Sequence, residues 1–257
     1  MDLNLKGKRA LVTGGSKGIG KACAQVLAEE GCAVMIASRD AAALAAAAAD
    51  IRAKTGAEVQ CKAADLSQRG VAEALAAVAG ELDILVNNAG AIPGGDLWKV
   101  DEDTWRRSWD LKVFGYINLT RAVYARMKAK HRGVIVNVLG AAGEKLNAAY
   151  IAGSTANAGL MAFTRTLGGV SPADGIRVVG VSPGPVATDR LLSLYKQMAA
   201  TKLGDANRYE ELFKGMGFDR PATAEEIAWT VAFAASGRSS YTSGVYITVD
   251  GGVTAKS

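Results

Sequence analysis

Residues 9–30 read RALVTGGSKGIGKACAQVLAEE, and this stretch decides the fold. A short apolar run, Arg9–Val12, leads into a turn with four glycines between positions 14 and 20, and the helix-forming segment Ile19–Glu30 follows at once. Short apolar runs bounded by turn residues are typical of strands, whereas Ala, Leu, Lys and Glu favour helix. The stretch therefore predicts a strand, a tight glycine turn and a helix in direct succession.

The same pairing of a short apolar run with a helix-length segment recurs along the chain of 257 residues. We interpret the runs as strands buried on both faces, and strict alternation of strand and helix predicts a parallel sheet wound on both faces. We therefore expect a single α/β domain, residues 1–257, with a Rossmann-like doubly wound parallel sheet. The predicted strands are Arg9–Val12, Ala33–Ala37, Val59–Lys62, Ile84–Val86, Val134–Val138, Arg177–Val181 and Tyr246–Val249, and the predicted helices include Ile19–Glu30, Ala41–Lys54, Val71–Val78, Asp101–Lys130 and Ala149–Leu167.

The charge pattern and the hydropathy exclude two classes of partner. The formal net charge is +5, and the Lys and Arg residues are scattered among 25 acidic residues, which does not favour nucleic-acid binding. The chain does not start with a basic segment and a long apolar stretch, and no later segment approaches the roughly 20 apolar residues that span a bilayer. We expect a soluble, cytoplasmic protein with neither nucleic acid nor membrane as partner.

The glycine turn has the residues that a pyrophosphate site requires. Glycines let the backbone approach a ligand closely, and the N-terminus of the following helix favours negative charge. A structural alternative is a tight strand-to-helix turn that needs glycine for its own geometry. The turn residues predicted to bind a dinucleotide are Gly14, Ser16, Lys17, Gly18, Ile19 and Gly20.

The end of the second predicted strand indicates which dinucleotide is bound. A protein that selects NAD(H) usually has a carboxylate there for the adenine ribose, but in this chain Ser38 and Arg39 come first. A hydroxyl and a guanidinium suit a 2′-phosphate, and Lys17 adds a second positive charge. We therefore predict NADP(H) in preference to NAD(H).

Several ordered motifs now identify a family. Together with the glycine turn and Tyr150, they make the whole chain resemble the short-chain dehydrogenase/reductase family. The motifs are Asp65-Leu66, Asn87-Asn88-Ala89-Gly90, Pro183-Gly184-Pro185-Val186-Ala187-Thr188 and Val249-Asp250-Gly251-Gly252.

The resemblance implies roles for further residues. It implies that Asp65 and Leu66 contact the adenine region, and that Asn87, Ala89 and Gly90 lie on the ribose side. It also implies that the segment from Pro183 through Gly184 and Val186 to Thr188 wraps the nicotinamide. It also implies a homo-oligomer, so a tetramer or a dimer is expected.

The catalytic residues depart from the family's pattern. Members have a Tyr that gives a proton to the substrate oxygen and a Lys one helical turn later, but the turn after Tyr150 ends in Ser154. The customary Ser after the fifth strand is replaced, since Leu139 and Gly140 occupy that place. The customary Asn of the long helix after the fourth strand aligns with Lys112.

A lysine is thus lost beside Tyr150 and gained on the neighbouring helix. We hypothesise that Lys112 is a relocated catalytic lysine, because an ammonium on a flexible stem can reach a phenol from another backbone position and lower its pKa. The alternative is that Lys112 is a solvated helix lysine and Tyr150 a core aromatic. Ser154 is a candidate for contact with the ribose, or else a helix-packing residue.

Residues 187–218 interrupt the alternation and are interpreted as a helical lid whose Leu, Met, Tyr and Phe side chains favour an apolar small-molecule substrate. The first hypothesis is an NADP(H)-dependent oxidoreductase that exchanges hydride with an alcohol or carbonyl group, with Tyr150 as general acid/base. The second is a dinucleotide-binding protein of the same fold without dehydrogenase turnover. The third is a reductase of activated C=C bonds. No metal site is predicted.

Overall fold

The computed structural model describes residues 2–256 and contains one seven-stranded parallel sheet. The strand order is β3-β2-β1-β4-β5-β6-β7, so the chain starts in the middle and winds outward twice. The predicted doubly wound α/β domain is confirmed. The strands are β1 (Arg9–Thr13), β2 (Ala33–Ser38), β3 (Val59–Ala63), β4 (Ile84–Asn87), β5 (Gly133–Val138), β6 (Ile176–Pro183) and β7 (Tyr246–Val249).

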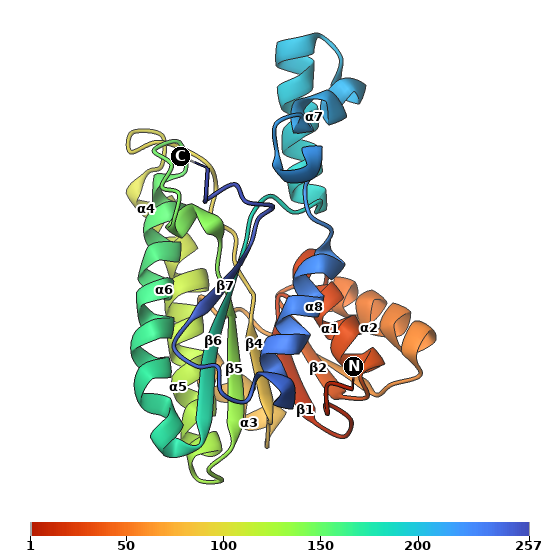
Figure 1. The fold of residues 1–257 in the computed structure, drawn as a ribbon, viewed down its shortest axis with the longest axis vertical. Coiled ribbons are helices and arrows are strands. Elements are labelled where there is room, and N and C mark those ends of the chain that lie inside the picture. Colours follow the sequence, from red (N-terminus) through yellow and green to blue (C-terminus); the bar gives the residue numbers. More distant parts are fainter. Residues whose placement is uncertain (1, 257) are drawn as a thin grey trace.

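Helices cover both faces of the sheet (Figure 1). The first face is packed by α1, α2 and α8 in one apolar cluster, and the second by α3, α5 and α6. Burial of these two apolar layers is the main stabilising term of such a fold. The helices are α1 (Gly18–Glu29), α2 (Ala41–Thr55), α3 (Val71–Ala79), α4 (Glu102–Trp109), α5 (Gly115–Lys128), α6 (Ile151–Val170), α7 (Asp189–Leu203) and α8 (Ala224–Ala235).

The two edge strands differ from the prediction that every strand is buried on both faces. In β3 only Val59 is buried, and all four residues of β7 are partly exposed. Both strands have a sheet neighbour on one side alone, and that neighbour follows from the strand order, which periodicity does not reveal. The prediction holds for the central strands β1 and β4, where every residue but Arg9 is buried.

The segment predicted as one helix, Asp101–Lys130, is divided. Helix α4 passes into a π-helical turn, η1 (Asp110–Phe114), before α5 begins at Gly115. The backbone N–H of Gly115 donates to the carbonyl of Asp110, five residues back. Turns of this kind commonly occur at functional sites, and this one contains Lys112.

Helix α7 stands clear of the sheet, together with the 3₁₀ turns η4 (Ala206–Phe213) that fold back against it (Figure 1). Three aromatic side chains of this hairpin pack on one another, with the Phe213 ring 5.2 Å from that of Tyr195 and 5.7 Å from that of Tyr209. Part of the apolar character of residues 187–218 therefore stabilises the hairpin itself. Within residues 2–256, no helix is long and apolar enough to cross a membrane.

Candidate active site

A cavity of about 640 Å³ opens at the carboxyl ends of the strands. It lies where the chain leaves β1 toward one side of the sheet and β4 toward the other, the point at which open α/β sheets bind their ligands. Its walls come from the glycine turn, from the ends of β2, β4 and β5, from η1 and from the start of α7. The cavity therefore joins the predicted dinucleotide site to Lys112.

The glycine turn is fixed by contacts that no larger residue permits. Gly14 has a left-handed φ of 67°, and a Cβ there would lie 2.8 Å from the Asn88 side-chain nitrogen. A Cβ on Gly20 would collide with the carbonyl oxygen of Gly14. Thr13 holds the turn to the end of β4, because its Oγ1 accepts from the backbone N–H groups of Asn88 (2.9 Å) and Ala89 (3.1 Å).

The end of β2 offers polar groups to the same cavity. Ser38 and Arg39 both line it, and the buried Ser38 hydroxyl has no hydrogen-bond partner among the described residues. The carboxylate of Asp40 accepts from the backbone N–H of Ala43 at 3.0 Å and so caps α2. An orphaned hydroxyl beside a guanidinium fits a phosphorylated ribose.

Lys112 reaches the cavity from the π-helical turn. Its stem lies against Gly90, where a Cβ would stand 3.0 Å from the Lys112 Cδ, and its Nζ donates to the carbonyl of Leu139 at 3.2 Å. Burial and the neighbouring charge of Arg190 lower the pKa of Lys112 to about 8. Lys112 is therefore not a freely solvated helix lysine, and its charge responds to pH near neutrality.

Tyr150 immediately precedes α6 and is partly buried beside an apolar cluster that includes Ile92, Val113 and Trp109. Its ring lies against Gly153 of its own helix, where any Cβ would collide with the ring. Burial raises the pKa of the Tyr150 phenol, and the positive charge of Arg190 offsets part of that rise. Tyr150 is not among the residues that line the 640 Å³ cavity.

Arg190 is a site residue that the sequence reasoning missed. It is the second residue of α7, lines the cavity and donates to the carbonyl of Ile92 in the loop after β4. Its charge acts on both Lys112 and Tyr150. Asn88 was missed as well, although it follows the predicted Asn87 directly; its side chain donates to the carbonyl of Thr13 at 3.0 Å.

The structure gathers only some of the predicted residues at the cavity. Ser154 exchanges hydrogen bonds with the backbone of Asn147, and Asn87 donates to Thr120 and Asn137 inside the core. The predicted residues that line the cavity are Gly14, Ser16, Lys17, Gly18, Ile19, Ser38, Arg39, Leu66, Ala89, Gly90, Lys112 and Thr188, whereas Gly20, Asp65, Asn87, Tyr150, Ser154, Pro183, Gly184 and Val186 lie outside its lining.

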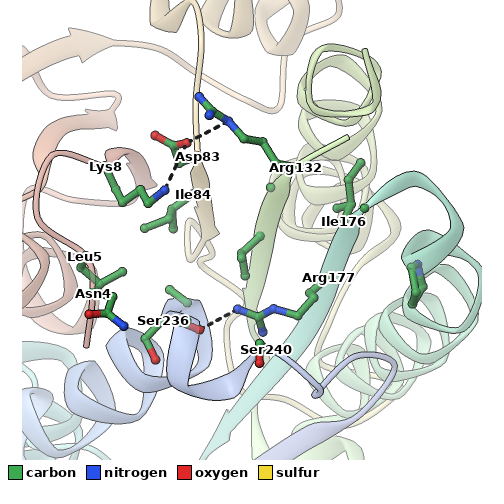
Figure 2. A pocket seen from close by; sticks show the side chains of 16 residues that line it. Asn4, Leu5, Lys8, Asp83, Ile84, Arg132, Ile176, Arg177, Ser236 and Ser240 are labelled. Carbon is green, nitrogen blue, oxygen red and sulfur yellow. Dashed lines mark hydrogen bonds and ion pairs between the residues drawn. The ribbon is translucent and has the colours of Figure 1, made fainter. Parts of the chain in front are cut away.

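A second cavity, of about 530 Å³, lies at the opposite, amino ends of the strands (Figure 2). Its charged side chains already have protein partners. Lys8 and Arg132 approach the carboxylate of Asp83, at 4.0 and 3.5 Å, and Arg177 donates to three backbone carbonyls, including that of Ser236 at 3.0 Å. The ion pairs join the starts of neighbouring strands, and Arg177 ties β6 to the end of α8, so the carboxyl-end cavity is the better candidate for chemistry.

Comparison with known proteins finds similar sequences and structures over nearly the whole chain. Residues 8–199 match the family described as short chain dehydrogenase. The 3-oxoacyl-[acyl-carrier-protein] reductase of Chlamydia muridarum is 33% identical over 98% of this chain and 100% of its own length. The cis-4-hydroxycyclohexanecarboxylate dehydrogenase of Sinomonas cyclohexanicum is 35% identical over 96% of each chain. The crystal structure of L-sorbose reductase from Gluconobacter frateurii, complexed with NADPH and L-sorbose, superposes with a TM-score of 0.94 at 29% identity, covering 100% of each chain.

Proposed function

The chain belongs to the short-chain dehydrogenase family, and we propose that it is an NADP(H)-dependent oxidoreductase that interconverts an alcohol and a carbonyl group. The observation that carries the proposal is the single cavity that joins the glycine turn to Lys112 and to the start of α7. The relatives that match over nearly the whole chain are named as reductases and dehydrogenases, which supports the reaction class. The L-sorbose reductase structure was solved with NADPH, which supports a nicotinamide cofactor.

Residues at the glycine turn and at the end of β2 would hold the cofactor. The turn and the N-terminus of α1 suit the pyrophosphate, and Ser38, Arg39 and Lys17 suit a 2′-phosphate. Thr188 and Gly90 line the same cavity, and the nicotinamide is expected beside them. When bound, NADPH supplies the hydride that the reduction of a carbonyl carbon requires.

Side chains of the protein would transfer the proton to and from the substrate oxygen. We assign Tyr150 as the general acid that protonates the carbonyl oxygen during reduction, and as the general base in the reverse direction. A buried phenol is a poor acid/base group at neutral pH, so a nearby cation is needed to stabilise the phenolate. We assign that role to Lys112, as the lysine relocated from the family's usual position.

One observation favours a second candidate, a dinucleotide-binding protein without turnover. Tyr150 packs beside an apolar cluster and does not line the cavity, and Ser154 in the family's lysine position is tied to Asn147. If the phenol does not reach a bound substrate, the fold retains its cofactor site while hydride transfer is lost. The two candidates make different predictions for substitution of Tyr150.

The deciding experiment is NADPH oxidation over a panel of ketones, aldehydes and enones that includes 4-oxocyclohexanecarboxylate, the keto form of the acid in the Sinomonas dehydrogenase's name. Tyr150→Phe is expected to lower kcat about a hundredfold or more while NADPH affinity, measured by fluorescence titration, stays unchanged. Tyr124→Phe, on the far side of α5 and hydrogen-bonded to Asp174, serves as the matched control. Tight NADPH binding without turnover of any compound would favour the binding-protein candidate.

We also propose that the protein is a homo-oligomer, a dimer or a tetramer. The outer face of α8 exposes Trp229 and Phe233, and Tyr241 and Val245 are exposed just before the edge strand β7. An apolar surface of this kind on a single chain is typical of an interface. Light scattering on the purified protein is expected to give a multiple of the chain mass, and Trp229→Glu is expected to reduce it.

A further inference from the structure

Arg190, exposed at the start of α7, lines the active-site cavity as a cation without an anionic partner among the described residues. It lines the cavity with Lys112, and within residues 2–256 no carboxylate lies within ion-pairing distance of its guanidinium. Within the described residues, its guanidinium donates one hydrogen bond, to the carbonyl of Ile92. A guanidinium has five N–H donors in a planar fork, so most of them remain free for a ligand.

Two neighbouring cations at one end of a cavity favour an anion there. Burial of Lys112, and secondarily the charge of Arg190, holds the pKa of Lys112 below its usual range, as expected where two positive groups line one cavity. The neighbouring cluster, which includes Ile92, Val113 and Trp109, is apolar and offers neither cation a counter-charge. A negative group between the two cations would offset their repulsion.

The cofactor's own charges have other partners. Lys17 and the N-terminus of α1 lie at the glycine turn, and Arg39 lies at the end of β2. Arg190 instead contacts the loop after β4 and acts electrostatically on Tyr150, the proposed proton donor. The anion that Arg190 recognises is therefore best sought on the substrate.

We propose that Arg190 binds a carboxylate of the substrate, so that the enzyme acts on an oxo acid or hydroxy acid with an apolar body. This inference rests on the proposed function, because it names the substrate class of the same site. The carboxylate is not altered in the reaction. It orients the substrate, so that Arg190 governs substrate affinity and the choice between an acid and its neutral analogue.

A binding experiment tests the proposal without any turnover. Isothermal titration of the NADPH-loaded protein compares cyclohexanecarboxylate with cyclohexanecarboxamide, which has the same shape but no charge. The wild type is expected to bind the carboxylate at least about tenfold more tightly than the amide. Arg190→Gln is expected to lose this preference, and Arg190→Lys to keep part of it. Arg208→Gln, an exposed lid arginine paired with Glu211, is the control that keeps it all.

A kinetic comparison extends the test to the reaction. With 4-oxocyclohexanecarboxylate and its methyl ester as substrates, Arg190→Gln is expected to raise KM about tenfold or more for the acid and to leave KM for the ester unchanged. Thermal unfolding of the loaded variant checks that it is folded. If neither compound is turned over, the proposed function fails for these substrates, and the titration alone decides the role of Arg190.

Three results would overturn the proposal. The first is a wild type that does not bind cyclohexanecarboxylate or binds it no better than the amide. The second is an Arg190→Gln variant that keeps the preference for the carboxylate. The third is a variant that loses NADPH affinity while its preference for the carboxylate is unchanged, since this would place Arg190 on the cofactor's pyrophosphate.

Discussion

The two ends of the active-site cavity are built in different ways. At the cofactor end, the glycine turn between β1 and α1 forms the wall together with the end of β2, and backbone contacts around Gly14 and Gly20 fix the shape of the turn. At the proposed catalytic end, Lys112, Tyr150 and Arg190 come from three distant segments, and the charge of Arg190 acts on the other two. The first end depends on local backbone geometry and the second on electrostatics between side chains that tertiary packing brings together.

This difference shows which substitutions each end tolerates. The close backbone contacts of the glycine turn leave no room for a side chain, so a single added methyl group forces the backbone of the turn to move. Side chains that act through their charge depend less on one backbone position, which is the basis of the proposal that Lys112 replaces the lysine missing beside Tyr150. Four predictions test this difference between the two ends and are given in order of decreasing expected effect.

One methyl group added to the glycine turn is expected to weaken cofactor binding strongly. Gly20→Ala places a Cβ against the carbonyl oxygen of Gly14 and is expected to weaken NADPH binding at least about a hundredfold, because the turn must move. Fluorescence titration with NADPH measures the affinity. Gly159→Ala is the matched control, since its added Cβ meets nothing within 4 Å. Equal NADPH affinity in both variants would contradict the conclusion that the backbone of the glycine turn is rigid.

The catalytic end is expected to depend on the Lys112 charge. Lys112→Met should lower kcat about thirtyfold at pH 7 with NADPH affinity nearly unchanged, because the phenolate loses its cation. With a pKa of about 8, Lys112 is charged below that pH and neutral above it, so wild-type kcat/KM should fall as the pH rises through 8. Steady-state kinetics from pH 6 to 10 provide the measurement. Lys128→Met, on the exposed side of α5, should behave like the wild type.

The choice of dinucleotide is expected to depend on Arg39. Arg39→Gln should weaken NADPH binding about tenfold and leave NADH binding unchanged, because a charge-assisted bond to the 2′-phosphate is lost. Competition titrations with the two dinucleotides measure the ratio. A parallel loss for NADPH and NADH would assign Arg39 to a part of the cofactor that both share.

The smallest effect expected is a shift in the pH profile. Arg190 lowers the pKa of Lys112, so Arg190→Gln should raise that pKa and move the alkaline fall in kcat/KM to higher pH, by less than about one pH unit. The methyl ester of 4-oxocyclohexanecarboxylate is the substrate of choice, because it removes any effect on carboxylate binding. An unshifted profile would show that the two cations do not interact in the working enzyme.

Local patterns in the sequence were enough for the architecture and for the cofactor end. The ends of β7 (Tyr246–Val249) agree with the prediction, and the other strands agree to within two residues. Two predictions that depend on tertiary neighbours were wrong. Strand β3 is mostly exposed because it lies at the edge of the sheet, and the predicted helix Asp101–Lys130 is interrupted by the π-helical turn. Helix α8 was not among the predicted helices, although Thr223 and Glu226 form the capping box that marks its start.

In the candidate site, too, sequence patterns identify some residues, whereas their contacts are seen only in the fold. Lys112 was found by comparison with the family's pattern, but only the fold shows that its ammonium meets the carbonyl of Leu139. Arg190 carries no signal in the sequence, because a basic residue after a Thr-Asp turn is an ordinary start to a helix. Its contact with Ile92 joins residues 98 positions apart. Ser154 looked available to a ribose, yet the fold uses its hydroxyl to hold Asn147.

The sequence by itself determined the order of strands and helices and the presence of the glycine turn, because both depend on interactions between residues close along the chain. Tertiary structure alone decided which cations share a cavity and how far each pKa departs from its usual value. The physical reason is that burial and charge are properties of a position in space. Residues such as Lys112 and Arg190 acquire them only when the sheet has formed and the start of α7 lies at the cavity beside η1.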